Sequence, residues 1–199
     1  MTIDLFIGLF IFAGVAAFTP GPNNTIALAS GVSFGFKRSL LLIFGLATGF
    51  RAMIACIGLG LGKIFETYPQ AYVVMKYAGA AYMLWLAWKI ATAKLQAEGQ
   101  ETTGAPFTFM QAALFQWINP KAWVMAATAL SAYTVATDYR TGMIAVVAIF
   151  AVMSFSSCAS WALFGVGLRH WLNDPRYFRK INIALALLLV GSLVPMLRH

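Results

Sequence analysis

The chain is short of charge, and of acidic residues above all. Only 10% of its 199 residues are charged, and aspartate and glutamate together number 6. A soluble domain carries about 25% charged residues. Here 61% of the residues are hydrophobic and the mean hydropathy is +0.78. The composition therefore excludes a soluble domain and predicts an integral membrane protein.

Cysteine and histidine are scarce as well. Cys56 and Cys158 lie inside apolar segments, where a thiol packs as a small hydrophobic group. The sequence therefore predicts neither a disulfide framework nor a metal site. His170 and His199 lie at segment ends, and no HExxH pattern occurs. We expect a protein that is not an enzyme and has no cofactor.

Basic residues give the chain a net charge of +8, and they cluster at the ends of apolar runs. That is the pattern of membrane topology signals rather than of a nucleic-acid surface. If the N-terminus faces outward, both termini lie outside and the inner loops hold eight basic residues against three outside. The inner set is Lys37, Arg38, Lys89, Lys94, Arg169, Arg176, Arg179 and Lys180, and the outer set is Lys63, Arg140 and Arg198. We expect a multi-pass protein that contacts lipid and no nucleic acid.

The longest uncharged stretch, residues 5–36, exceeds the ~20 residues that cross a bilayer as one straight helix. Pro20-Gly21-Pro22 lies at its centre and should break the helix there. Lipid cannot satisfy the freed backbone groups, so they must be buried in protein or face a wet cavity. Asn23 and Asn24 add side-chain donors and acceptors, and we interpret the stretch as the centre of a solute site. The alternative is a surface loop.

Six apolar segments follow from the sequence, in one membrane domain of residues 1–199. Polar residues 92–106 divide this domain into a first repeat, 1–91, and a second, 107–199. Asn119-Pro120 interrupts the fourth segment as the proline motif interrupts the first. With three spans per half, the halves must enter the membrane in opposite senses, and paired interrupted segments predict a transporter site at the midplane. The segments are 3–34, 39–61, 71–90, 107–137, 143–168 and 181–197.

Two cations, Arg51 and Lys121, lie well inside apolar segments. A charge at the bilayer centre costs at least ~2.5 kcal/mol, so it normally faces a cavity or a partner. Because acidic partners are few, a cationic cavity suits a substrate carboxylate, and half-helices that begin after Pro22 and Pro120 would add partial positive charge. The alternative is that both cations bond to carbonyls of the broken helices and only stabilise the fold.

Three motifs in order resemble the LysE/RhtB translocators, bacterial inner-membrane exporters of amino acids. The likeness in length, spans and spacing covers nearly the whole chain. Residues 84–91 and 182–190, with Asn23-Asn24, are similar to the branch that exports cysteine and O-acetylserine. The motifs are Thr19-Pro20-Gly21-Pro22-Asn23, Ala78-Gly79-Ala80-Ala81-Tyr82 with Trp85 and Trp88-Lys89, and Asn119-Pro120-Lys121-Ala122.

The resemblance implies efflux driven by the proton gradient, by alternating access, of small neutral amino acids of the cysteine, O-acetylserine, homoserine or threonine type. Many members carry aspartate where this chain has Asn23, which leaves Lys121 or Asp4 as proton carrier. A homodimer, a passive small-solute channel and a structural membrane protein remain open. The expected substrate-binding residues are Pro20, Gly21, Pro22, Asn23, Asn24, Arg51, Asn119, Pro120 and Lys121.

Overall fold

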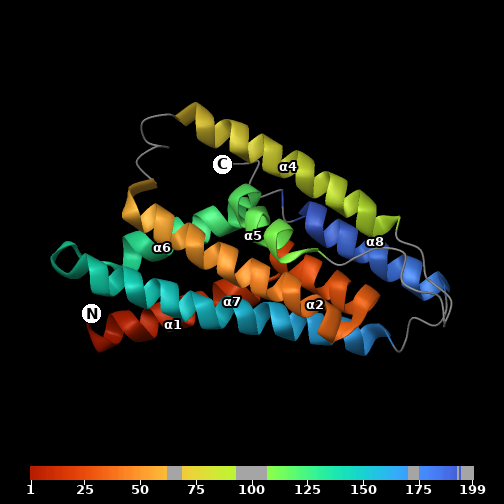
Figure 1. The fold of residues 1–199 in the computed structure, drawn as a ribbon, viewed down its shortest axis with the longest axis horizontal. Helices are drawn as coiled ribbons and strands as arrows, with labels where there is room; N and C mark the ends of the chain where they lie inside the picture. The colour runs from red at the N-terminus through yellow and green to blue at the C-terminus, as the bar shows by residue number, and fades with distance from the viewer. Residues whose placement is uncertain (62–68, 93–106, 170–174, 192, 194–199) are drawn as a thin grey trace.

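The computed structural model describes residues 1–61, 69–92, 107–169, 175–191 and 193. All regular elements in these ranges are helices, which confirms the all-α class. Figure 1 shows an elongated bundle whose long helices lie lengthwise beside one another. The elements are α1 (Ile3–Phe18), α2 (Pro22–Cys56), η1 (Ile57–Leu61), α4 (Pro69–Ala91), α5 (Phe109–Ile118), α6 (Pro120–Tyr133), η2 (Ala136–Asp138), α7 (Tyr139–Arg169) and α8 (Pro175–Gly191).

Both helix breaks fall at the predicted proline motifs. α1 ends at Phe18, and α2 begins at Pro22 after Gly21, whose backbone is extended (φ −179°, ψ −178°). α5 gives way to α6 at Asn119, and Pro120 opens α6. Proline suits the first helical position because the N–H that it lacks would be unpaired there in any case. Local chemistry is therefore enough to predict both breaks.

A glycine divides α2 into two limbs, residues 22–34 and 36–56. Gly35 has φ 77° and ψ 170°, in the region that favours glycine. The hydroxyl oxygens of Ser30 and Ser39 lie 2.7 Å apart, whereas the same span of straight helix would separate the two residues by about 13.5 Å. The chain therefore reverses at Gly35, slightly before the basic pair that we expected to close the first segment.

Glycines let the helices approach closely. A Cβ on Gly31 would overlap a backbone carbonyl of α7, and one on Gly165 would overlap a carbonyl of α2. Gly45 and Gly49 lie against the backbone of α5 in the same way. Their four-residue spacing predicts this contact, because small residues one turn apart form a flat face for a neighbouring helix. α2 is consequently packed between α5 and α7.

Large apolar side chains cover much of the outer surface of the bundle. Val15 of α1, Trp88 of α4 and Leu187 of α8 are examples, each more than half exposed. Exposed apolar surface of this extent is typical of a protein that faces lipid. Within the described residues, two helical stretches are long and apolar enough to cross a membrane, Pro22–Leu61 and Ala136–Leu168, and α1 is a shorter apolar helix.

Some expectations fall outside the described residues. They include the polar linker of residues 92–106, apart from Thr92, and three basic residues of the topology pattern, Lys63, Lys94 and Arg198. The division into two inverted repeats also stays a prediction at this point.

Gly165→Ala should destabilise the protein, because the new Cβ would overlap the carbonyl oxygen of Leu28 across the interface between α7 and α2. Overpacking of this kind costs about 1–3 kcal/mol. Gly167→Ala is the matched control on the same helix, since nothing lies within 4 Å of its Cβ position. In thermal unfolding of the detergent-purified proteins, we expect a clearly lower transition temperature for Gly165→Ala alone. Equal temperatures for the two variants would contradict the close packing.

Candidate functional site

Lys121 connects the two helix breaks. Its Nζ donates to the carbonyl oxygen of Thr19 at 2.7 Å and lies 3.5 Å from that of Pro20. Both carbonyls belong to the break between α1 and α2, where a continuous helix would have paired them with amides further along. The lysine belongs to the first turn of α6, so the second break supplies the cation that satisfies the first. An ammonium group has three protons, and one remains for another acceptor.

Three side-chain amides form a second link between the breaks. Asn23 Nδ2 donates to Gln116 Oε1, and Gln116 Nε2 donates back to Asn23 Oδ1, both at 3.1 Å. Asn119 Nδ2 donates to the same Asn23 Oδ1 at 2.9 Å. Asn119 Oδ1, however, is buried without a hydrogen-bond partner. Buried acceptors are nearly always paired, so this oxygen is suited to a donor that a ligand brings.

Asn24 satisfies the carbonyls at the end of α1. Its Nδ2 donates to the carbonyl oxygen of Ala17 at 2.8 Å and to that of Thr19 at 3.0 Å. Ser157 of α7 lies 2.8 Å from the Ala17 oxygen and 3.1 Å from Asn24 Oδ1, and its single proton is shared between these acceptors. The carbonyls of Ala17 and Thr19 therefore have protein donors.

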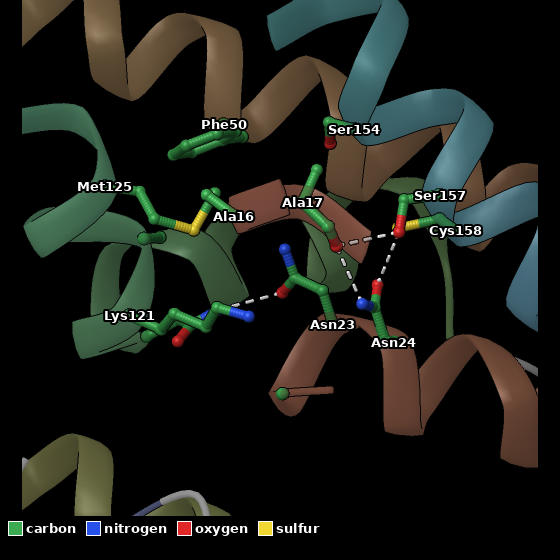
Figure 2. A pocket seen from close by; sticks show the side chains of 13 residues that line it. Ala16, Ala17, Asn23, Asn24, Phe50, Lys121, Met125, Ser154, Ser157 and Cys158 are labelled. Carbon is green, nitrogen blue, oxygen red and sulfur yellow. Dashed lines mark hydrogen bonds between the residues drawn. The ribbon is translucent and has the colours of Figure 1, made fainter. Parts of the chain in front are cut away.

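A small cavity lies between the two breaks and α7 (Figure 2). Its volume is about 30 Å³, which is room for water but not for a larger solute. Among the described residues of its wall, Lys121 is the only one with a charged side chain. The lining residues are Ala16, Ala17, Gly21, Asn23, Asn24, Phe50, Asn119, Lys121, Ala122, Met125, Ser154, Ser157 and Cys158.

The two half-helices that begin at the breaks add to the positive potential of the cavity. Gly21 precedes α2 and Asn119 precedes α6, both line the cavity, and neither makes a side-chain capping bond to its helix. A helix N-terminus carries roughly half a positive charge, which favours an anion nearby. Gly21 also makes room for the lysine, since a Cβ there would lie 2.8 Å from Lys121 Cδ. The cavity is suited to a carboxylate or another small anion.

The structure brings together most of the predicted site residues. Those in the cavity wall are Gly21, Asn23, Asn24, Asn119 and Lys121. The remaining prolines belong to the breaks themselves: Pro20, Pro22 and Pro120. Arg51 does not line the cavity; its guanidinium donates to Thr48 Oγ1 at 2.7 Å, and its Nε is buried without a partner.

Sequence reasoning missed Gln116, Phe50 and Met125. Gln116 carries a signal, because it is an amide in an apolar segment, three residues before Asn119 and therefore close to it in space. The two apolar residues carry none. Ser157, which sequence reasoning did not place at the site, bonds to the carbonyl oxygen of Ala17 on α1.

Two signs of catalysis are absent from the described residues, a metal-binding cluster and a nucleophile motif in its usual setting. Those residues contain no cluster of three or more His, Cys, Asp or Glu side chains that could hold a metal ion. Residues 31–35 have the GxSxG spacing of a hydrolase nucleophile, but they belong to a helix and its terminal turn. That motif requires a sharp turn between a strand and a helix.

A helical bundle with an apolar exterior, in which two interrupted helices line a cavity that holds a lysine, is the architecture of a membrane carrier for a small solute. Comparison with known proteins agrees with this class.

Residues 14–196 match the family model of the LysE type translocators, and the chain belongs to that family. It is a membrane translocator and not an enzyme. The chain is 34% identical over 192 residues to the cysteine/O-acetylserine efflux protein of Escherichia coli strain K12, with 96% of each chain covered. Proteins of the same name from Escherichia coli O6:H1 and Shigella sonnei are similar to the same extent. No solved structure matches the chain.

Asn24→Asp should destabilise the bundle strongly although it changes little in shape. The substitution replaces Nδ2 by an oxygen that faces two carbonyl oxygens, so two hydrogen bonds become repulsive contacts. Ser157→Ala removes one shared proton from the same cluster and should cost about 1 kcal/mol. Thermal unfolding in detergent should rank wild type first, Ser157→Ala second and Asn24→Asp last. An Asn24→Asp protein as stable as Ser157→Ala would show that Asn24 does not cap α1.

Proposed function

We propose that the protein exports small neutral amino acids across the bacterial inner membrane. Relatives of similar length are named for the efflux of cysteine and O-acetylserine. The observation that carries the proposal is the convergence of Lys121 and the N-termini of α2 and α6 on one cavity, whose described lining residues include no acidic side chain. This arrangement suits the carboxylate of an otherwise neutral molecule.

Both charged ends of an amino acid find partners in the proposed complex. The carboxylate accepts from the free proton of Lys121 and from the first amides of the two half-helices. The α-ammonium donates to Asn119 Oδ1, the buried acceptor without a partner. A substrate with a second positive charge would leave that charge unpaired beside the lysine, which favours neutral amino acids.

Transport requires the cavity to widen, since about 30 Å³ cannot hold an amino acid. The contact between Lys121 and Thr19 joins α6 to the end of α1 at 2.7 Å. A substrate carboxylate that accepts the third proton would draw the ammonium toward the cavity and so weaken the link that holds the two breaks together. A ligand shifts a conformational equilibrium only through such differential contacts, and this one provides for alternating access.

The proposed topology has six membrane passes in two inverted three-helix repeats, residues 1–91 and 107–199. The passes are α1 with limb 22–34, then limb 36–56, α4, α5 with α6, α7 and α8. In Figure 1, successive passes run in opposite directions along the bundle, which supports this order. Each repeat then opens with the pass that its proline motif interrupts.

Contacts at one end of the bundle support the proposed orientation. The amino group of Met1 lies 2.9 Å from Asp138 Oδ2, and Tyr139 Oη donates to the carbonyl oxygen of Gly58 at 2.8 Å. The start of α1, the end of the second pass and the connection from α6 to α7 therefore share one end. The bias of basic residues toward the other connections makes this the outer end.

The proton gradient is the proposed driving force. Asp4, one of the two candidate proton carriers, is exposed at the start of α1 and does not line the cavity. Lys121 does line the cavity, so of the two candidates it is the one placed to bind and release the coupled proton there.

Lys121→Met should abolish export while the protein still inserts and folds. Loss of a charge-assisted hydrogen bond costs about 1.5–3 kcal/mol, or roughly ten- to a hundredfold in binding. The assay is efflux of labelled O-acetylserine from proteoliposomes with an imposed pH gradient. Lys89→Met is the matched control, because Lys89 lies over the Trp85 ring on α4, outside the cavity. Normal export by Lys121→Met would remove the lysine from the mechanism.

Collapsing the pH gradient with a protonophore should stop concentrative efflux by the wild-type protein within the same proteoliposomes. A proton-coupled carrier loses its driving force under these conditions, whereas a passive channel continues to equilibrate its solute. Flux that is unchanged by the protonophore and linear with solute concentration would favour the channel.

A further inference from the structure

Ser154 of α7 is the polar side chain of the cavity wall that the fold leaves unused. Only 5% of it is exposed, and it lines the cavity. Its hydroxyl has no hydrogen-bond partner in the described part of the chain. Ser157, one turn further along α7, is instead committed to Ala17 and Asn24. Because Ser154 lines the cavity, its hydroxyl can pair with a group that enters there.

Ser154 and Lys121 belong to different walls of the cavity. Figure 2 shows Ser154 on the α7 side, beside Ala17, and Lys121 at the opposite side beside Asn23. A molecule whose carboxylate binds Lys121 would extend its other end toward α7. Few atoms fit there, because Ala16 and Ala17 of α1 are adjacent to it and the whole cavity is small.

We propose that Ser154 recognises the side chain of the transported amino acid, by a hydrogen bond to a hydroxyl, thiol or ester oxygen close to the α-carbon. This inference rests on the proposed function and adds to it the residue that discriminates between short polar and apolar side chains. An apolar side chain leaves Ser154 unpaired, and a long one meets the backbone of α1.

Serine and alanine are the matched probes, because they differ by the single hydroxyl that Ser154 would bind. In proteoliposomes, the wild-type protein should export serine in preference to alanine when each is supplied at the same concentration. Ser154→Ala should lower the serine-to-alanine ratio about three- to tenfold, the usual worth of one neutral hydrogen bond. The alanine rate should change little, which a merely structural role for Ser154 would not produce.

Two further variants separate recognition from packing. Ser154→Thr keeps the hydroxyl, so it should retain the preference for serine while it lowers export of the bulkier O-acetylserine. Ser156→Ala is the matched control, since Ser156 lies on the same helix, is half-buried and does not line the cavity. It should leave the serine-to-alanine ratio unchanged.

The outcomes distinguish this inference from the proposed function. A ratio that Ser154→Ala leaves unchanged, or serine and alanine rates that fall together, would overturn the role of Ser154 while export still depended on Lys121. The absence of amino-acid export by the wild-type protein, or export that Lys121→Met does not affect, would overturn the proposed function itself. A serine-to-alanine ratio that is lowered in Ser154→Ala and kept in Ser154→Thr supports both the role of Ser154 and the proposed function.

Discussion

Backbone carbonyls freed inside an apolar protein must find donors, and the structure around the first helix break depends on that requirement. The carbonyl oxygens of Ala17 and Thr19 receive donors from Asn24 on α2, Ser157 on α7 and Lys121 on α6. Since each donor comes from a different helix, the broken end of α1 holds three other elements in place. Lipid could supply none of these bonds. A break that would destabilise an isolated helix thus becomes the point where the bundle is joined.

One of these donors, Lys121, connects the structure with the proposed substrate binding. From the sequence, Lys121 could either bond the carbonyls of a broken helix or face a substrate. The geometry makes the two roles compatible, because an ammonium group has three protons and the break takes two. A lysine committed to both roles links occupancy of the cavity to the contact between α1 and α6. In a carrier, this link would couple substrate binding to movement of the helices. In a static scaffold, the bonds from Lys121 to the two carbonyls would be sufficient.

Sequence predicted the features that local chemistry determines. Proline inside an apolar run removes a backbone donor and clashes with the preceding turn, so both interruptions, and the residues beside them, could be placed without a structure. Features that depend on the rotation of one helix against another could not. Arg51 and Phe50 are neighbours in the chain, yet Phe50 lines the cavity and Arg51 bonds to Thr48 on its own helix. An apolar segment with one charge does not reveal which face meets a cavity. The sequence predicted the end of the first segment slightly after Gly35, where the chain in fact reverses. The reason is that basic residues mark a membrane boundary and not the turn itself.

The amide chain of Gln116, Asn23 and Asn119 explains how a neutral wall can serve a zwitterion. Each amide has one donor end and one acceptor end of nearly equal size, and the pairing of Asn23 with Gln116 is reciprocal. Turning all three amides by half a rotation therefore preserves every bond and presents Nδ2 of Asn119 in place of its unpaired Oδ1. A carboxylate at position 23 would remove this freedom, since it only accepts when ionised. With asparagine there, Lys121 stays the single charged side chain among the described residues of the cavity wall, and the polar edge can adapt to either end of the proposed substrate.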